Sequence, residues 1–404
     1  MSPPRAPVDP LTGLEAARLG VYVHFPYCLS KCPYCDFASI AAKQVPEARY
    51  ADAVLEELRL RLLAFPALEG REVHSVYLGG GTPSLWQPAY VARVLKGIAE
   101  RLRVARGAEV TLEANPGASD ASRFAGYREA GVNRLSIGVQ SFQPETLRFL
   151  GRGHDAAQAE AAFEAARRAG FSNVSLDLIY GVPGQSRSQA RSDAERAAAL
   201  APEHLSAYAL TLDKESLAEE VPLARQLARG EVSLPPDEEV IAMQRAARDA
   251  FSARGLVRYE ISNYARAGYH SRHNALYWSG GEYLALGTGA TGSLRANAGE
   301  GVRYSNLRSA EKWFQAIDRG ELPDAGVEPL SAKELLEERI AMGLRLSSGV
   351  DLEAACAEYG EDFRRRSEIA EQLLARGLLE RREGRWALTD AGADLHSAIS
   401  ARLM

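Results

Sequence analysis

Three of the four cysteines in this chain lie close together, and this group constrains the fold and chemistry more than any other feature. Cys28, Cys32 and Cys35 follow a short apolar run with the spacing C-x3-C-x2-C. Thiolates packed this closely select zinc or an iron–sulfur cluster. A structural zinc site needs four ligands, and no fourth Cys or His follows at a suitable spacing. The remaining cysteine, Cys356, lies near the other end of the chain.

Three thiolates on a four-iron cluster leave one iron without a protein ligand. S-adenosylmethionine (SAM) chelates such an iron with its amino and carboxylate groups, before electron transfer breaks its sulfonium C–S bond. The spacing therefore predicts a 4Fe–4S cluster with SAM as its partner. A chance grouping of core or surface cysteines is the alternative, and it is disfavoured because the whole chain has four cysteines.

The length and charge of the chain limit the classes of protein to which it can belong. A chain of 404 residues can hold two or three domains, and its net charge of −5 gives no electrostatic footprint for nucleic acid. No apolar run is long enough for a membrane span, and the first residues lack the pattern of a signal peptide. Grouped free cysteines indicate a reducing compartment. We therefore expect a cytoplasmic protein without a transmembrane segment or a nucleic-acid partner.

Between residue 20 and about residue 210, strand-like and helix-like segments alternate. The β-branched or aromatic runs are 21–25, 73–78, 110–113, 134–139, 174–179 and 205–210. The amphipathic stretches are 47–63, 89–103, 156–169 and 189–201. This alternation predicts parallel βαβ units. Six units predict an α/β fold with a partial (β/α)6 barrel rather than a closed eight-stranded barrel.

The unusual motifs all fall at the carboxyl ends of these predicted strands, the face on which barrel active sites are built. They are the cysteine loop, Gly79-Gly80-Gly81-Thr82-Pro83, Glu113-Ala-Asn115-Pro116, Gly138-Val-Gln140-Ser141 and Asp177-Leu-Ile-Tyr180-Gly181. Each has a plain alternative: a tight turn for the glycines, and a solvated side chain for Glu113, Gln140, Arg152 or Asp177. Their convergence predicts one site assembled from several loops.

After residue 212 the pattern changes. We expect helices over 213–230 and 238–254 and a strand over 258–264. The motif His273-Asn274-x-x-Tyr277-Trp278 follows. Histidine is an axial ligand of haem iron, and Tyr and Trp offer flat apolar surfaces to a porphyrin. The alternative is a buried aromatic corner with a hydrogen-bonded histidine.

From residue 331 the pattern of helix, turn, two short strands and a helix capped near Thr389 predicts a winged-helix-like domain. Acidic residues surround its basic ones, so it is expected to contact protein or act as a lid rather than bind nucleic acid. The predicted division is a flexible leader over 1–19, a barrel over 20–212, an α+β extension over 213–330 and the winged-helix-like domain over 331–404.

Taken together, the motifs resemble those of radical SAM proteins in the oxygen-independent coproporphyrinogen III oxidase family. The resemblance rests on the cysteine loop with Tyr34, Gly-Gly-Gly-Thr-Pro, Glu-Ala-Asn-Pro, Gly-Val-Gln-Ser-Phe, Leu-Gly-Arg-Gly-His, Asp-Leu-Ile-Tyr-Gly-Val-Pro-Gly and His-Asn-x-x-Tyr-Trp. It covers nearly the whole chain. The oxidases carry a further cysteine two residues after the third cluster cysteine, where this chain has Phe37. Phe37 and the His-Asn-x-x-Tyr-Trp motif resemble the branch of haem chaperones, HemW.

The resemblance implies roles for individual residues. Cys28, Cys32 and Cys35 match the ligands of the 4Fe–4S cluster, and Tyr22, Gly80 and Glu113 match positions that contact the cluster-bound SAM. A second SAM, tied to decarboxylation in the oxidases, is contacted there at positions that match Tyr34, Gly81, Thr82, Gln140, Arg152 and Asp177. His273 matches the histidine proposed to bind haem.

The implied function is to bind haem and transfer it to apo-haemoproteins, such as respiratory cytochrome subunits, with an electron donor for the cluster. The alternative is an enzyme that decarboxylates coproporphyrinogen III to protoporphyrinogen IX. A methylating or ring-forming radical SAM enzyme is a third hypothesis. The resemblance leaves open whether the protein is an enzyme and whether it forms a homodimer.

Overall fold

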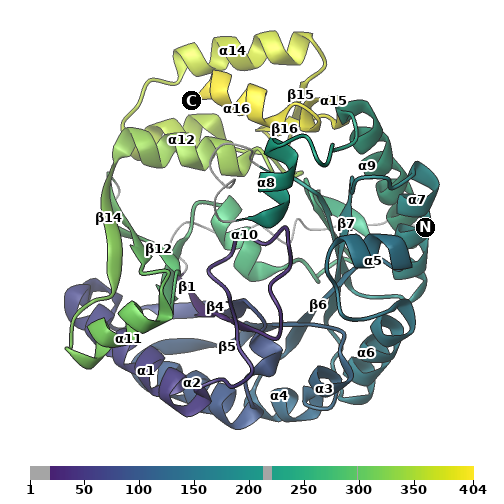
Figure 1. The fold of residues 1–404 in the computed structure, drawn as a ribbon. Helices are drawn as coiled ribbons and strands as arrows, with labels where there is room; N and C mark the ends of the chain where they lie inside the picture. Colours follow the sequence, from purple (N-terminus) through teal and green to yellow (C-terminus); the bar gives the residue numbers. More distant parts are fainter. Residues whose placement is uncertain (1–18, 213–220, 298) are drawn as a thin grey trace, which may run out of the picture.

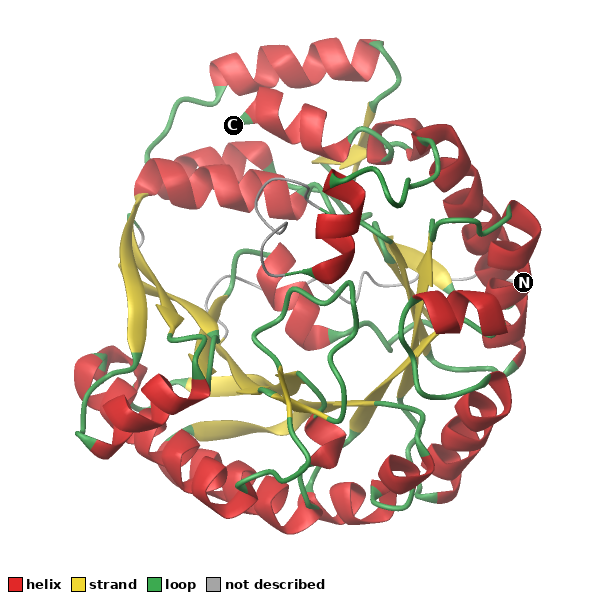
Figure 2. Ribbon diagram, in the orientation of Figure 1, coloured by secondary structure: helices red, strands yellow, loops and turns green. Residues whose placement is uncertain are grey.

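The computed structural model describes residues 19–212, 221–297 and 299–404, and twelve strands of this part form one curved sheet (Figures 1 and 2). Six parallel strands occupy its centre: β1 (Leu19–Phe25), β4 (Glu72–Gly80), β5 (Arg103–Ala114), β6 (Arg134–Gln140), β7 (Val174–Tyr180) and β8 (His204–Ala209). They coincide with the six strands predicted from the alternation of the sequence.

Helices cover the outer face of these strands, and Figure 1 shows the sheet as an open horseshoe inside them. The covering helices are α1 (Glu47–Ala64), α2 (Pro88–Arg101), α3 (Ala118–Ala121), α4 (Phe124–Ala130), α5 (Pro144–Phe149), α6 (Ala156–Arg168) and α7 (Arg187–Ala199). Short 3-10 turns at Pro66–Leu68 and Pro83–Leu85 complete this part. The main hydrophobic core lies between these helices and the sheet.

The segment after residue 220 extends both edges of the same sheet. At one edge β11 (Glu282–Leu286) lies parallel to β1, and β12 (Thr291–Asn297), β13 (Glu300–Asn306) and β14 (Asp324–Ser331) follow in antiparallel order. At the other edge β10 (Asn263–Ala265) pairs antiparallel with β8, and β9 (Val257–Glu260) pairs antiparallel with β10. The helices of this segment are α8 (Pro222–Ala228), α9 (Asp237–Ser252), α10 (Arg272–Trp278) and α11 (Ala310–Asp318).

The single strand expected over 258–264 is wrong, because the chain turns back at Ile261 and Ser262 to form the β9–β10 hairpin. The buried carboxylate of Glu260 accepts hydrogen bonds from the Ser262 backbone N–H at 2.9 Å and from Asn263 Nδ2 at 2.7 Å, and these bonds stabilise the turn. Part of the helix expected over 213–230 lies outside the described residues, as does the leader before Leu19.

The C-terminal elements have a hydrophobic core of their own. They are α12 (Ala332–Gly343), α13 (Leu352–Tyr359), α14 (Arg364–Ala375), β15 (Leu379–Arg382), β16 (Arg385–Leu388), α15 (Asp390–Ala393) and α16 (His396–Leu403). The helix, hairpin and helix follow the predicted winged-helix order. The Thr389 hydroxyl caps α15 by accepting the Gly392 backbone N–H at 3.0 Å.

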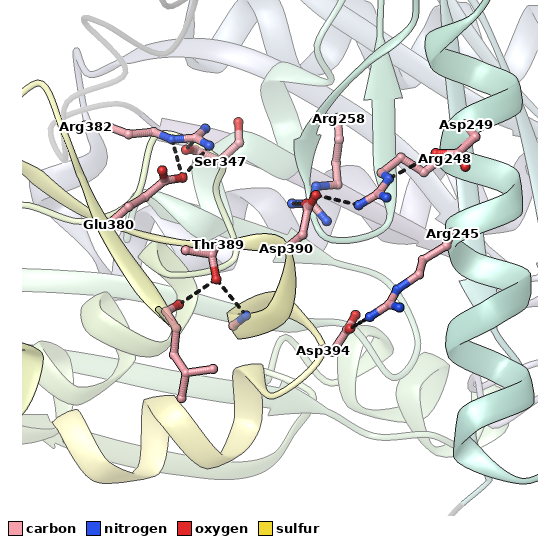
Figure 3. Close-up of polar contacts among 12 residues, drawn as sticks. Arg245, Arg248, Asp249, Arg258, Ser347, Glu380, Arg382, Thr389, Asp390 and Asp394 are labelled. Carbon is pink, nitrogen blue, oxygen red and sulfur yellow. Dashed lines mark hydrogen bonds and ion pairs between the residues drawn. The ribbon is translucent and has the colours of Figure 1, made fainter. Parts of the chain in front are cut away.

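These C-terminal elements bridge the two ends of the horseshoe. Helix α12 packs against β13 and β14 at one end of the sheet. At the other end Arg248 and Arg258 both pair with Asp390 at 2.8 Å, and Arg245 pairs with Asp394 at 2.7 Å (Figure 3). The horseshoe is therefore closed into a ring by residues 331–404. No helix in the described ranges has the length and apolar character that a membrane span needs.

Candidate functional site

A cavity of about 420 Å³ lies at the carboxyl ends of the parallel strands, and we call it the barrel cavity. The cysteine loop forms one wall, and the short parallel strands β2 (Tyr27–Cys28) and β3 (Ile40–Ala41) pair at the base of this loop. The cavity brings together Cys28, Cys32, Cys35, Tyr34, Gly80, Gly81, Thr82, Glu113, Gln140, Arg152 and Asp177. These are the predicted site residues except Tyr22 and His273.

The three cysteines of the loop are free thiols. Burial raises the pKa of Cys28 and of Cys35, whereas the hydroxyls of Thr82 and Ser39 lower them from 3.4 and 3.7 Å. No three His, Cys, Asp or Glu side chains of the described chain are grouped to hold a single metal ion. A cubane cluster binds each thiolate through a different iron, so its ligands lie farther apart than those of one ion. Three thiols on one loop are the donor set of a 4Fe–4S cluster that keeps one iron open.

Two glycines allow β4 to pass close to the cysteine loop. Gly80 has φ +111°, and a Cβ atom there would lie 2.6 Å from the His24 ring. A Cβ atom on Gly81 would lie 2.8 Å from the Pro26 backbone. The Gly81 N–H donates to Phe25 O at 2.7 Å and the Thr82 N–H to Tyr27 O at 2.9 Å. These positions require glycine because a side chain would collide with His24 or with the Pro26 backbone.

Glu113 ends β5 with its carboxyl group facing the barrel cavity. Oε1 accepts the Tyr77 hydroxyl at 2.8 Å, and Oε2 accepts the Gly80 backbone N–H at 3.0 Å. Burial raises the pKa of Glu113 to about 7, and the two hydrogen bonds oppose this shift. The group thus changes charge near neutral pH.

Arg152 connects the cysteine loop to the ends of β5 and β6. Its Nη1 lies 3.5 Å from Cys32 Sγ, and its Nη2 donates to Asn115 Oδ1 and to Gly138 O. Its Nε is buried without a hydrogen-bond partner within the described ranges, and so is Nε of Arg134 in the same cavity. Buried donors left unpaired are costly unless a ligand accepts from them. Both guanidinium groups line the cavity, where they suit a ligand that carries carboxylate, hydroxyl or ring-nitrogen acceptors, as SAM does.

Two further side chains in the cavity have unusual environments. Gln140 has φ +66°, a left-handed conformation that is rare for a residue with a side chain and that concentrates at functional sites. Asp177 is buried and accepts the hydroxyls of Ser136 at 2.9 Å and Ser175 at 3.2 Å. Burial raises the pKa of Asp177, and these hydroxyls lower it.

The predicted site residues leave out other polar residues of the barrel cavity, among them Asn115, Arg134 and Asn274. Asn115 accepts from Arg152 and donates to the Thr82 hydroxyl at 3.1 Å, and Arg134 and Asn274 line the cavity. Asn115 belongs to the Glu-Ala-Asn-Pro motif. Arg134 could have been noticed because a charged residue begins an otherwise apolar predicted strand. Asn274 belongs to the His-Asn-x-x-Tyr-Trp motif.

His273 does not lie in the barrel cavity, and its role as a haem ligand stays a prediction. The side chain is 1% exposed. Its Nδ1 is 2.9 Å from Ser75 Oγ and its Nε2 is 2.7 Å from Tyr277 Oη, so both ring nitrogens are engaged. Burial lowers the pKa of His273 to about 3. Its position corresponds to the alternative, a buried aromatic corner with a hydrogen-bonded histidine.

Tyr22 lines a second cavity, of about 770 Å³, on the other side of the cysteine loop. Its hydroxyl lies 3.0 Å from Nδ1 of His24, and His24 Nε2 donates to Ala38 O at 3.0 Å. Because a carbonyl can accept but not donate, Nε2 carries the proton and Nδ1 accepts from Tyr22. His24 thus ties the cysteine loop to β1. Asp36 and Phe37 line both cavities.

Comparisons with known proteins agree with this architecture. Residues 22–197 match the radical SAM superfamily, and residues 330–395 match the HemN C-terminal domain. Coproporphyrinogen III oxidase (HemN) from Escherichia coli has the same fold, with a TM-score of 0.79, 22% identity and coverage of 97% of this chain and 92% of that one. The predicted fold class is thereby confirmed.

Full-length relatives decide the family. The haem chaperone HemW of Mycobacterium tuberculosis is 37% identical, over 99% of each chain. This chain belongs to the HemW family. HemW of Haemophilus influenzae is 39% identical over 74% of this chain and 76% of its own. The radical S-adenosyl methionine domain-containing protein 1 of Bos taurus mitochondria is 37% identical over 85% of this chain and 76% of its own. The resemblance inferred from the motifs is confirmed, and the radical SAM family implies a 4Fe–4S cluster and SAM as cofactors.

Proposed function

We propose that this member of the HemW family is a haem chaperone, which binds haem and transfers it to apo-haemoproteins. The observation that carries the proposal is Phe37. The oxidases of the resemblance have a cysteine at this position, whereas here an aromatic side chain, 55% exposed, lines both cavities. An exposed apolar ring beside a large cavity suits a flat apolar ligand. Relatives named haem chaperone HemW support the same function.

In this proposal the barrel cavity holds the cofactors. Cys28, Cys32 and Cys35 ligate the cluster, and Gly80 and Glu113 hold SAM beside the open iron. When bound, this pair supplies one-electron reduction of the SAM sulfonium. Arg152 positions the loop through Cys32 and lines the cavity beside it. Tyr34, Gly81, Thr82, Gln140 and Asp177 remain the proposed contacts for a second adenosyl group, and Tyr22 supports the cluster-bound SAM from the second cavity.

Haem titration tests the proposal. When haem is added to purified protein, the Soret absorbance should saturate at about one haem per chain. The haem-loaded protein should then transfer its haem to an apo-cytochrome. In parallel, the reconstituted protein with SAM, a reductant and coproporphyrinogen III should give no vinyl-porphyrin product under anaerobic conditions. Absence of saturable haem binding, or sustained decarboxylation, would contradict the chaperone function and favour the oxidase alternative.

Further parts of the proposal concern partners and organisation. We propose respiratory cytochrome subunits as recipients, a reduced electron donor for the cluster, and a cytoplasmic location. Co-purification with haem-loaded protein, and fractionation of cells, test these points. We also propose that the functional parts of the chain divide at residues 212 and 330. We propose a homodimer as well, and the mass of the haem-loaded protein in solution tests it.

A further inference from the structure

The second cavity combines an aromatic surface with an unusual number of arginines. Its apolar wall comprises Phe37, Tyr277, Trp278, Tyr283, Leu335 and Met342. Within the described ranges its charged wall holds five arginines, Arg295, Arg303, Arg308, Arg339 and Arg345, against three carboxyl groups, those of Asp36, Glu282 and Glu338. We call it the arginine cavity. Guanidinium groups beside an aromatic wall suit a ligand that has a flat apolar body and anionic groups at its edge.

The His-Asn-x-x-Tyr-Trp motif divides its side chains between the two cavities. Asn274 lines the barrel cavity, whereas Tyr277 and Trp278 line the arginine cavity. His273 lies beneath Tyr277 and orients its hydroxyl through the 2.7 Å contact. The motif therefore builds an aromatic wall whose ring positions depend on the buried histidine.

Most arginines of the cavity already have protein partners. Arg295 pairs with Glu358 at 2.8 Å, Arg345 pairs with the buried Glu260 at 2.5 Å, and Arg303 pairs with Glu328 and Glu338. Each such pair leaves other guanidinium N–H groups free for a second acceptor, since arginine has five.

Arg339 on α12 differs from these. Its Nη1 is buried and has no hydrogen-bond partner in the described part of the chain. The side chain lies against Gly280, where a Cβ atom would meet Arg339 Cδ at 3.0 Å and Nη1 at 3.2 Å. Gly280 has φ +70° and ends the turn after Trp278, so Arg339 packs against the turn that follows the motif. Arg339 lines the cavity and forms no ion pair with a carboxylate of the described residues, so the exposed part of its guanidinium group suits a ligand carboxylate.

We propose that the arginine cavity is the haem site, with the macrocycle against Phe37, Tyr277 and Trp278 and the propionate carboxylates on Arg339 and Arg303. This inference rests on the proposed haem-chaperone function and assigns its site. The volume of about 770 Å³ is within the range of about 300–1,000 Å³ usual for cofactor pockets. The shared wall at Asp36 and Phe37 places the haem next to the cluster loop.

Haem dimethyl ester provides the direct test, because it has the same macrocycle but no carboxylates. Wild-type protein should bind haem about tenfold or more tightly than the ester, as expected for charge-assisted hydrogen bonds. Arg339→Gln, and more so Arg303→Gln with Arg339→Gln, should weaken haem binding about tenfold while changing ester binding little. Arg191→Gln on α7, whose partner is Glu195 at 2.7 Å, is the matched surface control.

A variant that is expected to bind haem more tightly shows whether misfolding explains the weaker binding of the other variants. Glu338→Gln removes a carboxyl group that competes for Arg303, so it should bind haem several-fold more tightly than wild type. SAM affinity should stay unchanged in all these variants, because Arg303, Glu338 and Arg339 do not line the barrel cavity.

The outcomes separate the two proposals. Saturable haem binding with equal affinity for the ester, and with no change in the arginine variants, would overturn the assignment of the site and leave the chaperone function standing. No saturable haem binding by wild type would overturn the function together with the site. Loss of ester discrimination in Arg339→Gln and tighter binding in Glu338→Gln would support the assignment.

Discussion

At the residue scale, two buried glutamates show how the surroundings of a carboxyl group decide its role. Burial raises the pKa of both Glu57 and Glu113 to about 7. The Glu57 carboxylate is enclosed by protein donors: the Gly287 N–H, Asn306 Nδ2 and Trp313 Nε1 at 2.6–3.0 Å. Glu113 faces the barrel cavity with two protein donors. The first is part of the scaffold, and the second is placed to receive a ligand.

Glu113 makes SAM binding dependent on pH. The ionised carboxylate is the stronger acceptor for the amino and hydroxyl donors of SAM, and it is the minor form below pH 7 because the pKa is raised. We expect SAM affinity to fall by up to about tenfold per pH unit below about pH 7 and to level off above it. Equilibrium SAM binding to reconstituted protein between about pH 6 and pH 8 measures this effect. Glu113→Gln should bind more weakly at about pH 8 and lose this dependence; an unchanged profile would contradict the assignment.

The cluster prediction belongs to the cysteines. Cys28→Ala, Cys32→Ala or Cys35→Ala should each remove most of the iron and of the cluster absorbance after anaerobic reconstitution, because each is expected to ligate a different iron. Cys356 is buried in the separate C-terminal core, so Cys356→Ala is the matched control and should keep about four irons per chain. Uptake of one zinc per chain without iron would refute the cluster.

Sequence motifs predicted most of the barrel cavity because its residues lie at strand ends, where the topology brings them together. Gly80 and Gly81 were recognisable since close backbone approach requires glycine. The burial and the partners of His273 could not be predicted, because a motif shows neither. Ser75 and Tyr277, which engage both of its ring nitrogens, belong to β4 and α10, and the first contact depends on the tertiary fold.

At the element scale, α1 is joined to the sheet extension by a buried ionic network. Arg61 and Glu57 lie one turn apart with both side chains fully buried, and Arg61 also reaches Asn306 on β13 and Asp324 on β14 at 2.7 and 2.5 Å. Glu57 in turn contacts Asn306 and Trp313. Residues from the first helix and from the last strands of the sheet thus depend on one another.

Arg61→Met should destabilise the protein by about 3–5 kcal/mol near pH 7.5, because it leaves the Glu57 carboxylate buried without its cation. The pKa of Glu57 is already raised and should rise further, so the folded state then favours the protonated form. A raised folded pKa means that stability is lost as pH increases through it. The deficit, measured by urea unfolding, should therefore shrink near pH 5.

The control for this variant is Arg59→Met on the same helix. Arg59 is exposed and pairs with Glu56 at 2.7 Å, so its removal should leave the unfolding midpoint unchanged. Similar losses from Arg59→Met and Arg61→Met would show that the buried network contributes nothing beyond helix packing.

The order of strands was predictable only where strand and helix alternate. The parallel position of β11 beside β1 could not be predicted from the sequence. Between α10 and β12 there is no alternation of strands and helices of the kind that indicates a parallel strand. The β9–β10 hairpin was taken as one strand since Ile261 and Ser262 lack the glycine or proline of a common turn. Instead, the Glu260 carboxylate stabilises the turn by accepting hydrogen bonds from the Ser262 backbone N–H and from Asn263 Nδ2.

At the scale of the whole molecule, residues 331–404 complete the arginine cavity by closing the ring. Helix α12 supplies Leu335, Glu338, Arg339 and Met342 to its wall, while β1 and the cysteine loop supply the opposite side. The C-terminal elements have their own core, and ion pairs connect α15 to α9 and β9 (Figure 3). Leu346 also packs with Tyr259 and Trp278 and bridges Glu260, so the ion pairs are one part of the attachment of this unit to the horseshoe.

Closure of this ring should control the release of haem from the arginine cavity. Asp390→Asn with Asp394→Asn removes the pairs to Arg245, Arg248 and Arg258, each worth at most about 1 kcal/mol at an exposed site. Loss of about 1–1.4 kcal/mol of closure raises the open population about five- to tenfold, so haem transfer to apomyoglobin should accelerate by that factor. SAM affinity should not change.

Glu371→Gln breaks a pair with Arg381 inside the C-terminal unit and should transfer haem at the wild-type rate. Equal rates in all three proteins would show that haem leaves without movement of the C-terminal unit.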